Sequence, residues 1–335
     1  MEFNFSNFAA NKPLESGKVE VLILGSGPAG LSAALYTARA ELKPVVLAGL
    51  EFGGQVSLTN TIENYPGFPD GIGGQELGEL FGKQAERFGA RIEYDTALEV
   101  DLSRRPFRVR TYSKEYLADS LIIATGATPV HLNIPGETEL TGRGVSYCAT
   151  CDGWFFKDKS VLVVGGGDSA LEEGLFLTRF ASVVTIIHRR DSLRAGAILQ
   201  KRARENSKIK FIWNTVVTEV KGDGVVAGVH LRNIQTGEES DLASDGLFIF
   251  VGHAPNTQLF RDQLEMDEHG YIKVDALMHA SVPGVFVAGE AGDPTFRQVV
   301  TSAGMGAAAG MQAVKFLEEH ASQPESLERK KNPLN

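Results

Sequence analysis

The stretch VEVLILGSGPAGLSAALYTARA, residues 19–40, decides the fold of this chain. An apolar, β-branched run at 19–24 is typical of a buried strand, and the Ala-rich stretch after the glycines is typical of a helix. In such a unit the turn and the positive end of the helix can bind a phosphate. Gly25 would make the turn, Gly27 would let the phosphate approach the backbone closely, and Gly30 would let the helix pack tightly against the strand.

The same order of elements returns in SVLVVGGGDSALEEGLFL, residues 160–177. One glycine turn can serve packing alone, but two in a strand–turn–helix context predict two dinucleotide-binding units. Further apolar runs predict parallel strands covered by helices, at residues 120–124, 183–187, 247–251 and 284–288. The predicted fold class is therefore α/β, with two Rossmann-like dinucleotide-binding domains.

Segments with Pro and Gly, 132–136 and 252–256, predict two crossings between domains, so that the second unit is inserted into the first. A small-residue helix at 304–317 would then return to the first domain, where a flat ring could lie against it. The polar ends predict loosely ordered extensions. The expected divisions are an N-terminal extension 1–17, a first domain 18–131 and 255–321, a second domain 132–254, and a tail 322–335.

Composition excludes several kinds of partner. The chain has 335 residues, 43% of them hydrophobic, which is enough for two packed domains. Its net charge of -9 argues against nucleic acid or an acidic membrane as a partner. Since no run of 18 apolar residues occurs and the start does not resemble a signal peptide, we expect no membrane association. The two cysteines, three positions apart, favour a reducing, cytoplasmic location over a secreted disulfide scaffold.

Charged residues near each glycine turn indicate which nucleotide binds. Glu51 lies about 20 residues beyond Gly30, where a ribose-binding carboxylate is expected, although it could equally be a solvated loop acid. The strand at 183–187 leads instead into basic residues, which would pair with a 2′-phosphate and favour NADP(H) over NAD(H). They are His188, Arg189 and Arg190, with Arg194 one helical turn further. A solvated basic turn is the alternative, and the neighbouring Asp191 weakens the phosphate interpretation.

Cys148-Ala149-Thr150-Cys151 holds both cysteines of the chain. This spacing can close a reducible disulfide and lower the pKa of one thiol. A zinc site is not expected, because no second cysteine pair exists and the loop contains no histidine, whereas a pair of inert buried thiols is the alternative. Asp152 could shuttle a proton as the disulfide opens, or it could simply cap the next turn.

With CATCD, GSGPAG, GGGDSA and HRRDSLR in place, the chain from about Val19 to Leu317 closely resembles the bacterial low-molecular-weight thioredoxin reductases. Other stretches match too: GGQ at 53–55, IENYPG at 62–67, ATGA at 124–127 and RQ at 297–298. The resemblance implies that NADPH reduces FAD, that FAD reduces the cysteine pair, and that the pair reduces thioredoxin. It assigns FAD to the first domain and NADPH to the second, and it implies a homodimer. A related reductase serving a peroxidase or a glutaredoxin-like protein is the alternative.

The resemblance also assigns roles to residues. Those expected at FAD are Gly25, Ser26, Gly27, Pro28, Ala29, Gly30, Glu51, Gly54, Gln55, Asn64, Ala97, Ala124, Thr125, Gly126, Glu290, Arg297, Gln298 and Val299. Those expected at NADPH are Gly165, Gly167, Asp168, Ser169, Ala170, His188, Arg189, Arg190 and Arg194. Cys151 would lie against the flavin, Cys148 would attack the partner disulfide, and Asp152 would act as acid and base. Trp154 and Phe155 would receive a thioredoxin side chain, or they could be packing residues.

One departure from the family lies before the C-terminal flavin segment. The family usually has Gly-Asp there, whereas this chain has Gly289-Glu290-Ala291-Gly292-Asp293. The usual aspartate binds a ribityl hydroxyl of the flavin. We expect either Glu290, with its extra methylene, or Asp293 to replace it. Backbone amides at Gln298 and Val299 would face the negative charge of the reduced flavin.

Overall fold

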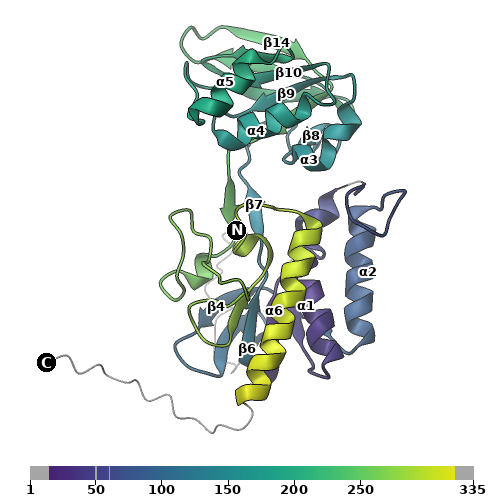
Figure 1. Ribbon diagram of the computed structural model, residues 1–335, viewed down its shortest axis with the longest axis vertical. Coiled ribbons are helices and arrows are strands. Elements are labelled where there is room, and N and C mark those ends of the chain that lie inside the picture. The colour runs from purple at the N-terminus through teal and green to yellow at the C-terminus, as the bar shows by residue number, and fades with distance from the viewer. Residues whose placement is uncertain (1–14, 50, 60, 321–335) are drawn as a thin grey trace, which may run out of the picture. The chain divides into compact units, whose positions relative to one another are not determined.

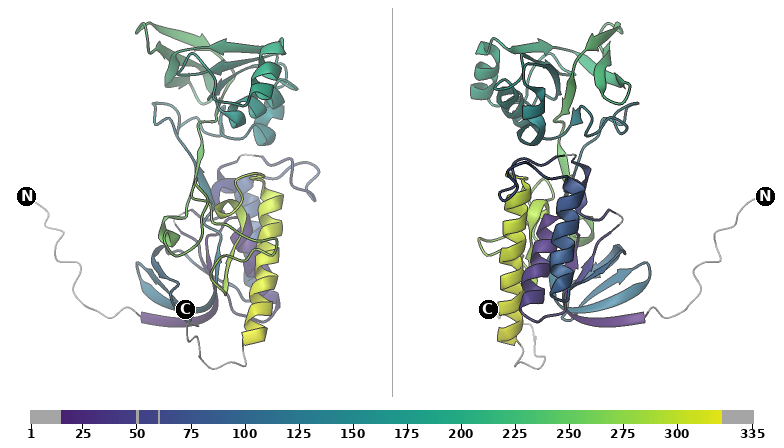
Figure 2. Two further views of the ribbon diagram at one scale, coloured as in Figure 1. Left: turned by 60° about the vertical axis from the view of Figure 1, so that its left-hand side comes forward. Right: turned by 90° about the vertical axis from the view of Figure 1, so that its right-hand side faces the viewer.

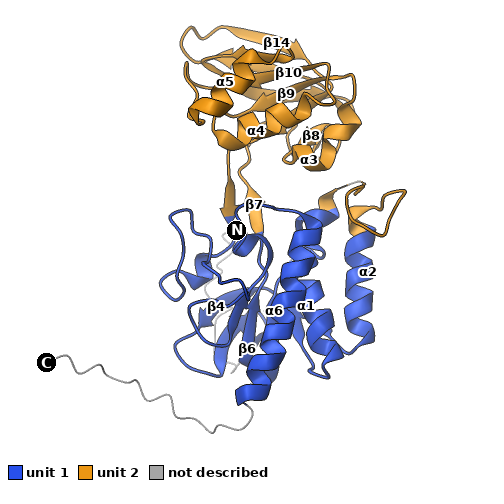
Figure 3. Ribbon diagram, viewed as in Figure 1, with its two compact units in different colours: residues 1–57, 76–126, 255–335 blue, residues 58–75, 127–254 orange. Residues whose placement is uncertain are grey.

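The computed structural model describes residues 15–49, 51–59 and 61–320. The chain forms two compact units, coloured separately in Figure 3: unit 1 comprises residues 1–57, 76–126 and 255–335, and unit 2 comprises 58–75 and 127–254. The α/β class is confirmed, with the second unit built mainly from an insertion into the first. Segment 58–75, expected in the first domain, groups instead with unit 2.

Unit 1 is built on a seven-stranded sheet. Its strands are β1 (Glu15–Leu24), β2 (Val45–Leu47), β3 (Arg91–Glu93), β4 (Ala97–Asp101), β5 (Phe107–Thr111), β6 (Lys114–Ile123) and β17 (Val285–Val287). Residues 15–17, expected in an N-terminal extension, begin β1 and pair with residues 114–116 of β6. Residues 1–14 and the tail from 321 lie outside the described residues.

The long strand β6 pairs in parallel with β1 along its length and has two different partners on its other side. Its first half, residues 115–118, pairs antiparallel with β5, which continues to β4. Its second half, residues 121–123, lies parallel to β1 on one side and to β17 on the other. Because side chains from both faces are buried there, the parallel part is continuously apolar, as expected for a sheet covered by other layers.

Three helices pack along unit 1: α1 (Pro28–Arg39), α2 (Gly74–Arg87) and α6 (Val299–His320), which run side by side in Figures 1 and 2. The α1–α6 contact is unusually close because of glycine. A Cβ on Gly306 would collide with the backbone of Ala29, and one on Gly310 would lie 3.0 Å from the carbonyl oxygen of Ala33. The expected helix at 304–317 is thus confirmed and begins five residues earlier.

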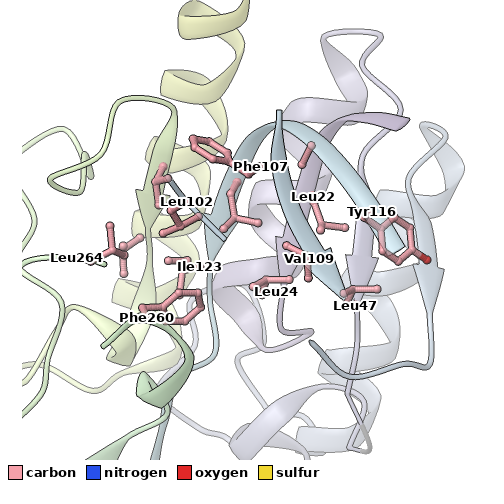
Figure 4. Packing of buried hydrophobic residues seen from close by; sticks show 14 of the residues in the cluster. Leu22, Leu24, Leu47, Leu102, Phe107, Val109, Tyr116, Ile123, Phe260 and Leu264 are labelled. Atoms are coloured by element: carbon pink, nitrogen blue, oxygen red, sulfur yellow. The ribbon is translucent and has the colours of Figure 1, made fainter. Parts of the chain in front are cut away.

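One hydrophobic core of unit 1 lies between its sheet and the segment after residue 255, and another lies between the sheet and helices α1 and α6. Leu22, Leu24 and Ile123 from the parallel strands meet Phe260 and Leu264 from this later segment, as Figure 4 shows. A short 3-10 helix, η4 (Gln258–Phe260), positions the aromatic ring. The return of the chain to unit 1 is therefore fixed by buried apolar contacts.

Unit 2 repeats the parallel arrangement in the strand order β11-β10-β9-β15-β8. The strands are β8 (Val145–Ser146), β9 (Ser160–Val164), β10 (Val183–Ile187), β11 (Ile209–Ile212) and β15 (Gly246–Ile249). Helices α4 (Asp168–Leu177) and α5 (Ala197–Glu205) share one core with this sheet. The other face packs on an antiparallel sheet of β12 (Thr215–Gly222), β13 (Val226–Asn233) and β14 (Glu239–Ala243).

The connections at residues 127–136 and 252–256 include β7 (Ala127–Pro129) and β16 (His253–Pro255), which pair as a two-stranded sheet. The expected strands at 160–164 and 183–187 are confirmed with the same bounds. The expected helical turn before Arg194 is wrong, because the chain from 189 to 196 is irregular and α5 begins at Ala197. In the described part of the chain, no helix is long and apolar enough to cross a membrane.

Candidate active site

The first glycine turn, in unit 1, is crowded on its protein side and open at one position. Gly25 has φ +113°, and a Cβ there would collide with the carbonyl of Ala124. A Cβ on Gly30 would collide with the carbonyl of Gly25. At Gly27, by contrast, the nearest atom to a Cβ would be a carbonyl oxygen 4.0 Å away. The opening therefore lies at the N-cap of α1, where the amides of a helix N-terminus favour a phosphate.

A second feature of unit 1 that fits a polar ligand follows β6. The Oγ1 atom of Thr125 is buried and has no hydrogen-bond partner among the described residues. Buried hydroxyls are normally satisfied, so this atom fits a ligand that supplies a partner. Ala124 is buried, and next to Thr125 a Cβ on Gly126, which has φ +67°, would meet nothing within 4 Å.

The loop facing the first turn holds several predicted flavin residues. The hydroxyl of buried Ser26 donates to Ala48 O at 3.1 Å and accepts from Gly53 N at 3.2 Å, so it fixes this loop. The side chains of Glu51 and Gln55 are exposed. Their binding of FAD stays a prediction, as does that of Ala97 at the start of β4 and of Asn64 in segment 58–75.

The C-terminal segment of unit 1 contains the two candidate flavin-binding carboxyl groups, those of Glu290 and Asp293. The buried Asp293 carboxylate accepts backbone N–H groups from Thr295 at 2.8 Å, Phe296 at 2.9 Å and Arg297 at 3.3 Å. It therefore builds the turn that leads to α6. Glu290 lies three residues earlier, in the 3-10 helix η5 (Gly289–Ala291), and its binding of FAD stays a prediction.

Glu290 carries an unusual proton affinity. Burial raises its pKa to about 7, although the positive charge of Arg297 acts in the opposite direction and Asp293 adds to the rise.

Nearby, the backbone N–H of Gln298 donates to Thr301 Oγ1 at 3.3 Å. That the amides of Gln298 and Val299 face the flavin stays a prediction.

The second glycine turn, in unit 2, has the same crowded and open positions. Gly165 has φ +154° and would place a Cβ 2.6 Å from the carbonyl oxygen of Phe250, while a Cβ on Gly166 would collide with the ring of His188. A Cβ on Gly167 would meet nothing within 4 Å. The opening again lies at the N-cap of a helix, here α4. Asp168 is turned to the protein, because its Oδ1 accepts from Gly196 N at 2.7 Å.

The basic segment folds back onto this turn. The N–H of Arg194 donates to the carbonyl of Gly166 at 2.7 Å, which brings residues 188–196 next to the opening. Arg189, Arg190 and Arg194 are exposed, whereas His188 is 6% exposed. Burial and the three guanidinium groups lower the pKa of His188, despite a hydrogen bond with the Ser192 backbone that acts oppositely. Three exposed guanidinium groups beside an open glycine turn fit a phosphorylated ribose.

The redox loop follows β8 in the same unit. Cys148 and Cys151 form a disulfide with their Cα atoms 5.3 Å apart, and the short helix α3 (Ala149–Asp152) contains the second cysteine. The carboxyl of Asp152 accepts from Ser146 Oγ at 2.6 Å. Burial raises the pKa of Asp152, and the Ser146 hydrogen bond reduces this rise. Asp152 makes no capping bond to the next helix, η3 (Gly153–Phe156), so the capping alternative is wrong.

Three residues that support this loop were missed by the motifs: Ser146, Glu173 and Glu137. Glu173 of α4 accepts from Ala149 N at 3.1 Å. Glu137, 2% exposed, accepts from Leu132 N at 3.0 Å and from the hydroxyl of Tyr147 at 2.8 Å, next to Cys148. None of the three has a sequence signal of its own, because their roles depend on contacts made in the fold.

Two large aromatic side chains next to the loop are exposed. Trp154 is 54% and Phe155 is 42% exposed, whereas Phe156 is buried against Phe248 with ring centres 5.1 Å apart. Trp154 rests edge-on against Phe180 at 5.8 Å, and the Lys157 ammonium lies 5.5 Å from its ring centre. Packing explains the position of Phe156, whereas Trp154 and Phe155 keep large exposed areas, and their binding of a partner stays a prediction.

Known proteins share this arrangement. The model of the family described as pyridine nucleotide-disulphide oxidoreductase matches residues 19–306. A thioredoxin reductase of Streptomyces coelicolor is 50% identical over 312 residues, which cover 91% of this chain and 97% of that protein. A bifunctional thioredoxin reductase/thioredoxin of Mycobacterium leprae is 49% identical over 305 residues, 90% of this chain and 66% of that protein.

A solved structure agrees with these sequence relatives. The crystal structure of thioredoxin reductase from Streptococcus pyogenes has a TM-score of 0.87 and 44% identity, covering 90% of this chain and 99% of that one. The matched residues 19–306 contain both glycine turns and the redox loop described above. The chain therefore belongs to the thioredoxin reductases of the pyridine nucleotide-disulphide oxidoreductase family.

Proposed function

We propose that this protein is an NADPH-dependent thioredoxin-disulfide reductase that uses FAD. The observation that carries the proposal is the Cys148–Cys151 disulfide, formed in the same unit as an open glycine turn beside Arg189, Arg190 and Arg194. A disulfide near a dinucleotide site fits electron transfer better than a structural staple, because a loop closed over three residues adds little stability.

The residues of unit 1 fit FAD. The opening at Gly27 would admit the pyrophosphate at the N-terminus of α1, and Thr125 Oγ1 would find the partner that it lacks among the described residues. Glu290 would hold a ribityl hydroxyl, since the Asp293 carboxylate is occupied by backbone N–H groups. When bound, FAD passes two electrons from the nicotinamide to the disulfide.

In unit 2 the open position at Gly167 would admit the NADPH pyrophosphate. Guanidinium groups of Arg189, Arg190 and Arg194 would pair with the 2′-phosphate, which NADH lacks. Ser169 and Ala170, in the first turn of α4, would face the same phosphates.

The cysteine pair would be reduced by two electrons and would then pass them to thioredoxin. Two electrons and one proton break the S–S bond and leave one thiolate and one thiol. The Cys148 thiolate attacks the disulfide of thioredoxin and forms a mixed disulfide, which Cys151 then cleaves while reforming the intramolecular bond. One sulfur of thioredoxin takes a second proton from solvent when Cys148 attacks, and the other takes the proton of the Cys151 thiol when Cys151 attacks, so that the product is a dithiol. Asp152 is the group that would give and take the proton at these sulfurs, and its raised pKa suits both directions.

Thioredoxin would dock on Trp154 and Phe155, whose exposed rings offer apolar area for one of its side chains. The Mycobacterium leprae relative, whose name includes both activities, supports thioredoxin as the partner. A peroxidase or a glutaredoxin-like protein is the second candidate partner, because two exposed aromatic rings could also contact a redox protein other than thioredoxin. The family resemblance supports a homodimer and a cytoplasmic location.

The test is NADPH oxidation by the FAD-loaded protein with and without purified thioredoxin. We expect turnover that depends on thioredoxin, is much slower with NADH, and is lost in Cys148→Ser. Equal rates with NADH, or activity that survives Cys148→Ser, would overturn the proposal. Replacing thioredoxin with a glutaredoxin-like protein or a peroxidase in the same assay separates the candidate partners.

A further inference from the structure

Ser146 joins both ends of the redox loop through one hydroxyl. It lies at the end of β8 and is 4% exposed. Its Oγ donates to Asp152 Oδ2 at 2.6 Å, accepts from Cys148 N at 3.1 Å, and lies 3.2 Å from Cys148 O. The backbone of the first cysteine and the side chain of the residue after the second cysteine are therefore tied to the same atom.

A serine hydroxyl has one proton and two acceptor lone pairs. One lone pair accepts the Cys148 N–H. The proton points to Asp152 when that carboxyl is ionised, because a carboxylate is a stronger acceptor than a carbonyl. When Asp152 is protonated, its own O–H donates to the second lone pair of Ser146, and the hydroxyl proton turns to Cys148 O. Both protonation states of Asp152 are thus fully hydrogen-bonded.

We propose that Ser146 is a positioning residue for thiol–disulfide exchange, which holds the Asp152 carboxyl at the redox loop and redirects its own proton whenever Asp152 gains or loses one. This inference rests on the proposed function. It adds a residue that no motif marks.

The other groups packed around Asp152 leave the stabilisation of its carboxylate to Ser146. Helix α3 packs against α4 and η3, and η3 carries no charged side chain. The charged residues of α4 are all acidic: Asp168 and Glu172 are exposed, and Glu173 accepts from Ala149 N. On the strand side, the pKa of Tyr147 is raised by burial and by its bond to Glu137, so it stays a neutral phenol. The hydrogen bond from Ser146 is the interaction that lowers the pKa of Asp152 against the effect of burial.

The test follows the reaction of the reduced cysteine pair with a small aromatic disulfide reagent as a function of pH. The FAD-loaded protein is first reduced with dithiothreitol, so that neither NADPH nor thioredoxin is needed. The limb of the pH profile that Asp152→Asn removes belongs to Asp152. In Ser146→Ala we expect this limb to move to higher pH by about one to two pH units, because a hydrogen bond to a charged group is lost.

Matched variants separate positioning from a general loss of structure. Ser146→Thr keeps the hydroxyl and should restore the wild-type profile. Ser244→Ala removes an equally buried hydroxyl, bonded to Ser160 O and Gly246 O at 2.9 Å each, and should leave the profile unchanged. If Ser146→Ala does not fold, Ser146→Val is compared with Ser146→Thr, since the two match in shape and differ in the hydroxyl.

An unshifted limb in Ser146→Ala, or an equal shift in Ser244→Ala, would overturn the inference. Failure of the proposed function would show differently: the wild type would then not oxidise NADPH with thioredoxin, whatever the behaviour of Ser146. With thioredoxin as substrate, Ser146→Ala should change kcat at neutral pH and leave KM unchanged, because Trp154 and Phe155 are untouched. A changed KM with an unchanged kcat would contradict the positioning role.

Discussion

Replacing Glu290 by glutamine removes a half-buried carboxyl whose pKa is raised from 4.5 to about 7. The folded protein therefore binds a proton that the unfolded chain has already released between these pH values. Because the folded state binds this proton more tightly than the unfolded state, the free energy of unfolding falls as pH rises. The stability contributed by protonated Glu290 is fully present below pH 4.5 and is lost as pH rises through about 7. Glutamine stays neutral throughout, so Glu290→Gln should lose none of it.

The size of the effect follows from the same shift. At about 1.4 kcal/mol for each pH unit, a rise from 4.5 to about 7 corresponds to about 3 kcal/mol. The free energy of opening in Glu290→Gln should therefore exceed that of the wild type by an amount that grows by about 3 kcal/mol from pH 4.5 to pH 8. Other titrating groups cancel in this difference because both proteins contain them.

The assay is hydrogen exchange of peptides from β17, measured by mass spectrometry on protein stripped of flavin, because this strand reports the stability of unit 1. The pH dependence of intrinsic exchange is subtracted with the same peptides unfolded. A difference between variant and wild type that stays constant from pH 4.5 to pH 8 would refute the raised pKa. A difference of opposite slope would show that the folded state stabilises ionised Glu290.

Three further predictions concern other parts of the chain. Burial alone would raise the pKa of Glu137, but its hydrogen bonds hold the pKa below the ordinary value. Glu137→Gln should therefore lower the free energy of unfolding of unit 2 by about 2–3 kcal/mol at pH 7, and this loss should shrink as pH falls below 4.5. Urea unfolding followed by tryptophan fluorescence checks this, and a loss that does not depend on pH would contradict it. Gly306→Ala should force α1 and α6 apart, lower the free energy of unfolding by about 1–3 kcal/mol and cause loss of bound FAD. Gly304→Ala is the control, because a Cβ there meets nothing within 4 Å, and it should leave the Tm unchanged. Equal Tm values for the two variants would contradict the close packing of α1 on α6. Replacing Arg189 and Arg190 by alanine should each raise KM for NADPH about 10–100-fold and leave KM for NADH nearly unchanged, and a parallel loss for both nucleotides would exclude a 2′-phosphate role.

The sequence predicted the parts of the fold that repeat a local pattern. β9 and β10 have the expected bounds because their apolar runs are flanked by glycines or charges. β6 was expected only over its apolar half, residues 120–124, because its first half alternates and pairs with β5 in a hairpin that no glycine signal marks. Arg194 was expected one helical turn beyond Arg190, but the chain is irregular there because the backbone N–H of Arg194 bonds to the glycine turn.

The candidate site was predictable where a residue type is itself the signal. Both cysteines, Asp152 and the arginines are found together with their own glycine turn in unit 2. Ser146 and Glu173 were not predictable, because a serine or a glutamate acts there only through hydrogen bonds that the packed loop creates. The choice between Glu290 and Asp293 likewise needed the turn that Asp293 builds.

The most direct test of the proposed electron path is an anaerobic titration of the FAD-loaded protein with NADPH, followed by flavin absorbance and by counting thiols. Flavin and disulfide each accept two electrons, so the wild type should take up about two equivalents of NADPH per chain and release two thiols. Cys148→Ser should take up about one. Full flavin reduction in the wild type after about one equivalent, with the Cys148–Cys151 disulfide still intact, would contradict the account.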